Sequence, residues 1–244
     1  MSSRLVIWHT NDMHGRLSLP VAERLRELRE GTPNGLLLDA GDALAAGNVV
    51  WRRREPVLEM MGLAGYEAMC LGNREFHVWQ VGFAGKLRQC PHPVLCANLR
   101  SRTRPLPSML RASLVVEVGR AKVGLIGLTV PMVTASMAAA RLSHYLFEAP
   151  VQAAKRLAAE LRPECELLIA VTHIGLKRDR ELVEAVPEMD LVVGGHSHTP
   201  LNEPEEHRAR CIVQSAPYAK AVGRVEIELG RSGVKVLGGE LIAL

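Results

Sequence analysis

The chain has few aromatic residues and little net charge. Aromatic side chains make up 4% of its 244 residues, and 30 Lys and Arg against 26 Asp and Glu leave a formal net charge of +4. So small an excess of positive charge does not indicate nucleic acid or a membrane surface as the main partner. Disordered and low-complexity classes are excluded as well, because 48% of the residues are hydrophobic and 23% are charged, as in an average globular protein.

Paired cysteines and long hydrophobic segments are also missing. No two of the five cysteines form a Cys-x-x-Cys motif, so a zinc or redox site of that kind is not indicated. The first apolar run, residues 5–8, is four residues long and polar residues follow it at once. A signal peptide or a membrane span needs a longer apolar segment. We therefore expect reduced thiols, a cytoplasmic location and no membrane partner.

Short apolar runs alternate with longer amphipathic segments along the chain. The runs predict strands at 5–8, 36–40, 67–71, 94–97, 114–118, 122–128, 167–171, 191–193, 212–214, 223–229 and 234–237. The amphipathic segments predict helices at 20–30, 55–63, 78–90, 151–162 and 178–186. This alternation predicts an α/β fold with an antiparallel addition near the C-terminus, built as one domain over residues 1–244. Residues 100–108 are expected to form a long loop, and residues 132–141 an exposed loop or lid.

Asp, Asn or His follows five of these predicted strands, and a glycine adjoins most of them. The residues in question are Asp12, His14, Asp42, Asn73, His173, His196 and His198. Ligands of open α/β sheets bind beyond the carboxyl ends of the strands, so these side chains are expected to meet at one edge. Each residue taken singly is also explained by a buried core histidine or a simple turn. The occurrence of all five motifs in order favours a shared site.

The side chains in this set suit a pair of divalent transition-metal ions. Carboxylate, amide and imidazole ligands fit Mn, Fe, Co, Ni or Zn, and the absence of thiolates argues against a structural zinc site. Two such ions about 3.5–4 Å apart hold the attacking and leaving oxygens of a phosphoryl displacement. A water that bridges them has a lowered pKa and becomes the nucleophile.

Six segments of the sequence share a further likeness. They read HTNDMHGRL (9–17), GDALAAGN (41–48), EPVLEMMGLAGYEAMCLGNREF (55–76), VTHIG (171–175), VVGGHSHTP (192–200) and IVQSAPYAKAVGRVEIEL (212–229). Together they resemble the metallophosphatase domain of the 5′-nucleotidases, which belong to the calcineurin-like metallophosphoesterases. The resemblance implies a four-layer αββα sandwich with two metal ions at the sheet edge. It further implies that Asp12, His14 and His198 hold one ion, that Asn73, His173 and His196 hold the other, and that Asp42 bridges both.

One motif departs from the pattern of that family. The family usually has Gly-Asn-His-Glu-Phe-Asp, whereas this chain has Gly72-Asn73-Arg74-Glu75-Phe76-His77. Arginine stays protonated and cannot act as a general acid, but it can stabilise charge on phosphoryl oxygens. We predict a swapped catalytic pair in which Arg74 binds the phosphate and His77, on the same side of a helical turn, supplies a proton. The alternative is that Arg74 only fills space and activity is lost. Glu75 is expected to fix the Asn73 loop by accepting hydrogen bonds.

A second departure concerns substrate specificity. The two-domain 5′-nucleotidases bind the nucleoside between aromatic rings of a C-terminal domain, whereas residues 199–244 of this chain are expected to complete the metallophosphatase domain. Tyr218 and Trp51 are the candidates for stacking on a base, and packing is the simpler interpretation of both. The arginines at 52–54 could attract an anionic substrate, although a solvated surface cluster is the simpler interpretation.

The sequence thus predicts a dinuclear metal-dependent phosphohydrolase that acts on a small phosphorylated substrate, with a nucleotide as one candidate. Two alternatives stay open. One is a binding protein that retains the metal site and a phosphorylated ligand without turnover. The other is a phosphodiesterase.

Overall fold

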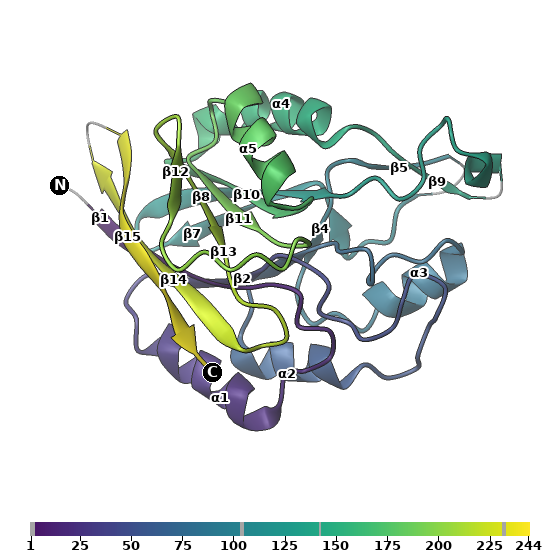
Figure 1. The fold of residues 1–244 in the computed structure, drawn as a ribbon, viewed down its shortest axis with the longest axis horizontal. Coiled ribbons are helices and arrows are strands. Elements are labelled where there is room, and N and C mark those ends of the chain that lie inside the picture. Colours follow the sequence, from purple (N-terminus) through teal and green to yellow (C-terminus); the bar gives the residue numbers. More distant parts are fainter. Residues whose placement is uncertain (1–2, 103–104, 142, 231–232) are drawn as a thin grey trace.

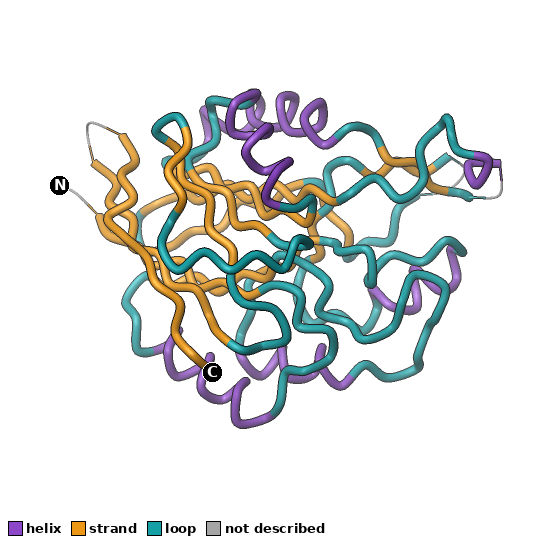
Figure 2. Tube along the Cα trace, in the orientation of Figure 1, coloured by secondary structure: helices purple, strands orange, loops and turns teal. Residues whose placement is uncertain are grey.

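The strands of the protein gather into two large sheets that lie face to face (Figure 1 and Figure 2). The computed structural model describes residues 3–102, 105–141, 143–230 and 233–244. One sheet has the order β15 (Gly233–Ala243), β14 (Ala221–Gly230), β1 (Ser3–Thr10), β2 (Gly35–Asp39), β3 (Ala68–Cys70), β4 (Val94–Leu95) and β6 (Leu110–Arg111). The other has the order β12 (Glu205–His207), β13 (Arg210–Gln214), β11 (Leu191–Gly194), β10 (Leu167–His173), β8 (Ala121–Thr129) and β7 (Ser113–Val118).

Helices cover the outer face of each sheet. In Figure 1, α1 (Leu19–Glu30) and α2 (Pro56–Ala64) lie below the sheets, while α4 (Pro150–Leu161) and α5 (Leu176–Ala185) lie above them. Proline occupies the first turn of α1, α2 and α4, where its missing N–H breaks no hydrogen bond. The short helix α3 (Gln80–Leu87), the strand pair β5 (Leu99–Ser101) and β9 (Tyr145–Phe147), and the 3₁₀ turns η1 (Ala138–Arg141) and η2 (Arg162–Glu164) complete the described part.

The alternation of side chains along β1 explains why its sheet is apolar on both faces. Leu5 and Ile7 pack between the two sheets, whereas Val6 and Trp8 point to the opposite face and join the core under α1 and α2. Successive residues of a strand point to opposite faces, so an unbroken apolar run predicts a strand that is buried on both sides.

Strand β10 plays the same part in the second sheet. Leu167, Ile169 and Val171 contribute to the core between the sheets, and Leu168 and Ala170 contribute to the core under α4 and α5. Three apolar layers therefore separate four layers of secondary structure. This arrangement confirms the predicted four-layer αββα sandwich.

Most predicted elements are present, but the three strands near the C-terminus divide between the sheets. β13 pairs with β11 in parallel, whereas β14 pairs with β1 and β15 in the antiparallel direction. The short strands β5, β6, β9 and β12 were not predicted, because two or three residues show no periodicity. The predicted loop at 100–108 contains the end of β5, and its residues 103 and 104 lie outside the described part. Residues 132–141 end in the η1 turn.

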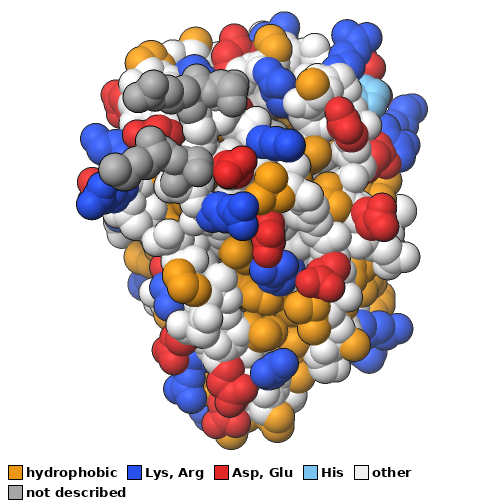
Figure 3. Space-filling view, turned by 90° about the vertical axis from the view of Figure 1, so that its left-hand side faces the viewer, with side chains coloured by type: hydrophobic (Ala, Val, Ile, Leu, Met, Phe, Trp, Pro, Cys, Tyr) orange, Lys and Arg blue, Asp and Glu red, His pale blue; other side chains and the backbone are white. Residues whose placement is uncertain are grey.

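Neither positive nor negative charge dominates the face of the molecule shown in Figure 3. This face carries the β14–β15 pair, and acidic and basic side chains lie interspersed on it. All five cysteines are unpaired, and burial raises the pKa of the Cys70, Cys90 and Cys96 thiols. Within the described residues, no helix combines the length and apolar character that a membrane span needs.

His9 of β1 is buried on the same face as Leu5 and Ile7 and is 1% exposed. It pairs across the ladder with Gly223, where a Cβ atom would lie 2.0 Å from His9 Nε2, so a side chain at position 223 would collide with the ring. Burial lowers the pKa of His9 to about 3.

This buried histidine predicts a loss of stability in acid. Between pH 6.5 and about 3, the unfolded chain takes up a proton that folded His9 does not accept, so the free energy of unfolding falls as the pH falls. For this one group the slope approaches about 1.4 kcal/mol per pH unit. We expect His9→Asn to remove this component, which urea unfolding of both proteins at pH 7, 5.5 and 4.5 would measure. A constant difference between the two proteins across this range would contradict the assignment.

Candidate metal centre

The loops that follow β1 and β2 lie side by side at the carboxyl edge of their sheet. β1 and β2 are parallel neighbours, so both strands end at this edge. The amide of Asp12 donates to the carbonyl of Gly41 at 2.9 Å, and the amide of His14 donates to the carbonyl of Asp42 at 2.9 Å. These two hydrogen bonds hold the side chains of Asp12, His14 and Asp42 in one neighbourhood.

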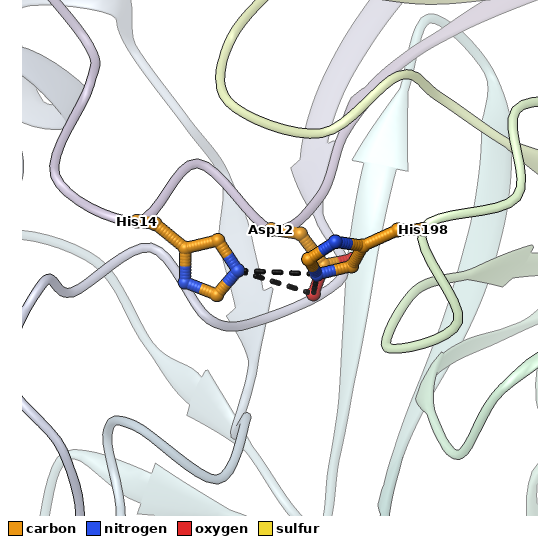
Figure 4. A group of neighbouring side chains, drawn as sticks. All are labelled: Asp12, His14 and His198. Carbon is orange, nitrogen blue, oxygen red and sulfur yellow. Dashed lines mark hydrogen bonds and ion pairs between the residues drawn. The ribbon is translucent and has the colours of Figure 1, made fainter.

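The first group of the site consists of Asp12, His14 and His198 (Figure 4). His14 Nε2 and His198 Nε2 are 3.1 Å apart, and His198 Nε2 lies 3.2 Å from Asp12 Oδ1. His14 Nε2 lies 3.9 Å from the same carboxylate oxygen. His198 follows β11 in the second sheet, so this group joins the edges of both sheets. Figure 4 shows the two imidazole rings, which come from different loops, meeting at the Asp12 carboxylate.

The second group surrounds His173, the last residue of β10. His173 Nε2 lies 3.2 Å from Asn73 Oδ1, 3.3 Å from His196 Nδ1 and 3.4 Å from Asp42 Oδ1. His173 Nδ1 lies 2.7 Å from the carbonyl oxygen of Ala40. A carbonyl oxygen only accepts, so Nδ1 donates there, and in a neutral ring Nε2 presents its lone pair to the group. The structure thus brings all seven predicted ligands together.

The electrostatics of the site favour a bound cation. Burial lowers the pKa of His173, but the hydrogen bond and the charge of Asp42 outweigh it and raise the pKa to about 9. Among the described residues, the buried oxygen Asp12 Oδ1 has no hydrogen-bond partner. The carboxylates therefore draw positive charge into a site whose nitrogen and oxygen atoms face one another. A divalent cation fits this donor set, and no thiolate takes part.

Asp12 is the carboxylate that the two groups share. A donor atom of Asp12 lies within 4.8 Å of donor atoms of His14 and His198, and within the same distance of donor atoms of Asp42 and His173. Asp42 belongs to the second group in this arrangement. The bridging role predicted for Asp42 therefore stays a prediction.

Five of these residues have a backbone conformation that is rare outside glycine. The φ angles lie between 50° and 77° at Asp12, His14, Asp42, His196 and His198. Such strain persists where surrounding contacts enforce it, and it is concentrated at functional sites. Gly72 serves a related purpose, because a Cβ atom there would lie 2.3 Å from the amide nitrogen of Asp42. Only glycine lets the Asn73 loop approach Asp42 so closely.

Glu75 holds the Asp42 and Asn73 loops together. Its carboxylate accepts hydrogen bonds from the amides of Asp42 at 2.9 Å, Gly72 at 2.8 Å and Leu44 at 3.0 Å. Burial, with the charge of Asp42, raises the pKa of Glu75 to about 6, so the group accepts as a carboxylate at neutral pH. The predicted positioning role of Glu75 is confirmed.

Arg74 lies at the edge of the site, as predicted. Its amide donates to Asp42 Oδ1 at 2.8 Å, and its Nη1 donates to the carbonyl of Ala45 at 2.7 Å. The guanidinium Nε is 3.7 Å from Asp42 Oδ2, and about a third of the side chain is exposed. A fixed positive charge therefore faces the cluster and remains reachable from solvent.

His77 does not share a helical turn with Arg74, and that expectation was wrong. The turn covers residues 73–75, and α3 begins at Gln80. The His77 ring is buried against Gly82, and its Nδ1 lies 3.0 Å from the amide nitrogen of Trp79, which donates to it. Within the described part of the chain, no hydrogen bond or ion pair joins His77 to Arg74 or to the seven predicted ligands.

A buried lysine, Lys86, contacts the backbone between Arg74 and His77, and the sequence did not reveal this contact. Lys86 Nζ donates to the carbonyl oxygens of Arg74 at 2.5 Å, Gly47 at 2.8 Å and Phe76 at 3.3 Å. These contacts fix the backbone at residues 74 and 76 against α3. A lysine in an amphipathic segment carries no sign of this role.

Two further polar residues support the cluster and were not assigned a role in advance. Asn11 Nδ2 donates to Asp12 Oδ2 at 2.9 Å, and its Oδ1 accepts from the amide of Ser215 at 2.7 Å. Asp39 accepts from Thr10 Oγ1 at 2.7 Å and from the amide of Gly41 at 2.9 Å. Both residues lie next to a predicted ligand loop. This position is the feature of the sequence that could have indicated their role.

The residues at 51–54 have structural roles in the described contacts. The Trp51 indole lies against α3, where a Cβ on Gly85 would be 2.5 Å from the ring. Arg54 forms two hydrogen bonds with Glu59, at 2.6 and 2.7 Å, on the exposed surface. One side of the Trp51 ring packs on α3, and 43% of the residue is exposed. A solvated ion pair accounts for Arg54.

Comparison with known proteins gives consistent matches over most of the chain. The sequence model of the calcineurin-like phosphoesterases matches residues 5–200. The 5′-nucleotidase of Rattus norvegicus is 30% identical over 281 aligned positions, which cover 95% of this chain and 47% of that protein. The trifunctional nucleotide phosphoesterase protein YfkN of Bacillus subtilis is 27% identical over 94% of this chain and 18% of its own length.

Two solved structures show the same fold. The 5′-nucleotidase precursor of Thermus thermophilus superposes with a TM-score of 0.82 at 26% identity, covering 99% of this chain and 55% of that one. The NAD nucleotidase of Haemophilus influenzae superposes with a TM-score of 0.83 at 20% identity, covering 100% and 57%. The chain therefore spans about half the length of the 5′-nucleotidases that it matches, and less of YfkN.

Proposed function

Because the chain belongs to the calcineurin-like phosphoesterase family, we propose that it is a metal-dependent phosphohydrolase. Its reaction would take place at the cluster formed by the two groups around Asp12 and His173. The observation that carries the proposal is the convergence of seven oxygen and nitrogen donors from both sheet edges. Their lone pairs face one another at 3.1–3.4 Å around His173, His198 and Asp12.

We assign two divalent cations to the cluster. Asp12, His14 and His198 would hold one, and Asn73, His173 and His196 would hold the other. Asp42 completes the second set and is the proposed bridge. When bound, such a pair supplies a water of lowered pKa as nucleophile and neutralises charge on the phosphoryl oxygens. The donor set suits Mn, Fe, Co, Ni or Zn.

Arg74 is the proposed binding and catalytic residue for the phosphoryl group. Its guanidinium stays charged at all relevant pH values, so it contributes electrostatic stabilisation and holds no transferable proton. The hydrogen bond to the Ala45 carbonyl fixes the side chain beside Asp42 before any substrate binds. Because the group is oriented in advance, its charge acts on the transition state with little reorganisation.

The substrate class follows from the names of relatives and from the form of the site. Relatives named as nucleotidases support a small phosphorylated substrate, with a nucleotide among the candidates. We expect p-nitrophenyl phosphate to be hydrolysed in the presence of Mn²⁺ and bis(p-nitrophenyl) phosphate to be hydrolysed more slowly. Release of p-nitrophenol from both esters measures this directly.

The same assay separates the alternatives. Faster turnover of the diester would favour a phosphodiesterase. Binding of inorganic phosphate without turnover of either ester, in protein shown to contain two metal ions, would favour a non-catalytic binding protein and contradict the proposed function. A screen of phosphorylated metabolites with the metal-loaded protein would then identify the substrate.

A further inference from the structure

Tyr218 forms a wall of the site beside the Asp12–His14–His198 group. The centroid of its ring lies 5.2 Å from that of His14 and 5.5 Å from that of His198. Its amide donates a hydrogen bond to the carbonyl oxygen of Asp12 at 2.8 Å. The residue lies in the connection between β13 and β14, so this connection contacts the first group.

Two cationic side chains lie around the Tyr218 ring. The guanidinium carbon of Arg16 is 5.0 Å from the ring centroid, and Lys220 Nζ is 6.0 Å from it. Both distances lie within the range of cation–π attraction. Arg16 and Lys220 are exposed, and within the described residues neither side chain has a carboxylate partner or a hydrogen bond. Two positive charges without counter-charges thus lie next to a site for phosphate.

The backbone at Tyr218 is held in an unfavourable conformation. The φ angle is 66° at Tyr218 and 52° at Ala219, a region that a bulky aromatic residue rarely adopts. The same feature occurs at Asp12, His14 and His198, whose side chains form the first group. Strain of this kind persists where the surrounding structure enforces it. The hydrogen bond from the Tyr218 amide to the Asp12 carbonyl ties this strained segment to the first group.

The geometry points to a second anion subsite, in which Arg16 and Lys220, held at the ring of Tyr218, bind a second phosphate on the leaving group of the substrate. The inference rests on the proposed function. It predicts a preference for bisphosphorylated substrates over monophosphates with a neutral leaving group. Tyr218 is a positioning residue, because it acts by placing Arg16 and Lys220.

The reaction of a substrate that occupies this subsite is an ordinary hydrolysis at the metal centre. The oxygen of water forms a bond to the scissile phosphorus, and the bond between that phosphorus and the leaving oxygen breaks. The leaving oxygen keeps the electron pair of the broken bond and takes up a proton that the water has lost, and the leaving group keeps its own phosphate. The products are inorganic phosphate and a monophosphate. Arg16 and Lys220 neutralise the phosphate that departs with the leaving group.

Two aryl substrates test the subsite in the metal-loaded protein. Benzene-1,4-diyl bisphosphate carries a second phosphate on the leaving group, and phenyl phosphate does not. We expect the ratio of their kcat/KM values to fall about five- to tenfold in Arg16→Gln and in Lys220→Gln, the size expected for one charge pair that is exposed to water and its high dielectric constant. The change is expected in KM, with the metal content of both variants unchanged.

Matched variants separate this effect from general damage. Arg24→Gln removes an exposed arginine that pairs with Glu27 on α1, and the ratio should stay at the wild-type value. Tyr218→Leu should lower the ratio as Arg16→Gln does, because the ring that places the cations is lost. Tyr218→Phe keeps the ring and should restore the wild-type ratio.

An unchanged ratio in both Arg16→Gln and Lys220→Gln, with phenyl phosphate still hydrolysed, would overturn the subsite and leave the proposed function intact. Loss of metal from these variants would also overturn it, since it would place the residues in the metal centre. Absence of turnover of either substrate by wild-type protein with two bound metal ions would overturn the proposed function and the subsite together.

Discussion

Asp42→Asn should lower the kcat for p-nitrophenyl phosphate by about 10³-fold or more, because a metal centre contributes several kcal/mol to the stabilisation of the transition state. The variant keeps the size of the side chain and an oxygen that can accept from the amide of Arg74. Asparagine also tolerates the φ angle of 58° at this position. The substitution therefore removes the negative charge with little other change.

Metal content is the second measurement for this variant. We expect Asp42→Asn to retain less metal than wild-type protein after dialysis, and chelation of wild-type protein to abolish turnover until Mn²⁺ is restored. Asp190→Asn is the matched control. Asp190 precedes β11, whereas the predicted ligands His196 and His198 follow that strand, and its carboxylate pairs with Arg162. Full metal content and full turnover in Asp42→Asn would show that Asp42 is not a ligand.

Arg74→Ala should lower kcat by about 10²–10³-fold with the metal content unchanged, the usual effect of losing one transition-state donor. Arg74→Lys keeps the charge but not the planar guanidinium, so we expect a partial recovery. Steady-state kinetics with p-nitrophenyl phosphate and metal analysis of each variant provide the test. Wild-type kcat in Arg74→Ala would mean that Arg74 only fills space.

The role of His77 is decided by a separate variant. Its ring contacts Trp79 and Gly82, with no hydrogen bond to Arg74 or the predicted ligands among the described residues, so we expect His77→Gln to keep kcat within about twofold rather than to lose a general-acid contribution. A tenfold loss together with the loss of one limb of the pH–rate profile would instead establish the proton-donor role predicted from the sequence. The double variant Arg74→His, His77→Asp restores the residue types of the family and is the natural comparison.

The candidate ligands could be predicted because each follows a strand whose apolar pattern is unambiguous. The run at 5–8 requires a strand buried on both faces, and Asp12 and His14 must then lie beyond its end. The same reasoning places Asn73 and His196. The position of each residue at the end of a predicted strand is a local property of the sequence. It could therefore be predicted without the distant contacts that bring these residues together.

The relative position of the Arg74 and His77 side chains could not be predicted in the same way. Their separation of three residues suggested one face of a helix. In the structure the backbone of this segment donates to Glu75 at Gly72 and accepts from Lys86 at Arg74 and Phe76. The Lys86 contacts depend on a helix that meets this segment only after folding. Sequence spacing carries no information about such competing partners.

From the order of amino acids one can read an α/β chain, a four-layer arrangement through its family resemblance, and seven metal-ligand candidates, because periodicity and strand-end chemistry are local properties. The three-dimensional arrangement was needed to divide the last strands between two sheets and to make Asp12 the carboxylate common to both groups. It was also needed to place Tyr218 with Arg16 beside the histidines. These features join segments as far apart as residues 12 and 218, and such contacts arise from the packing of whole layers.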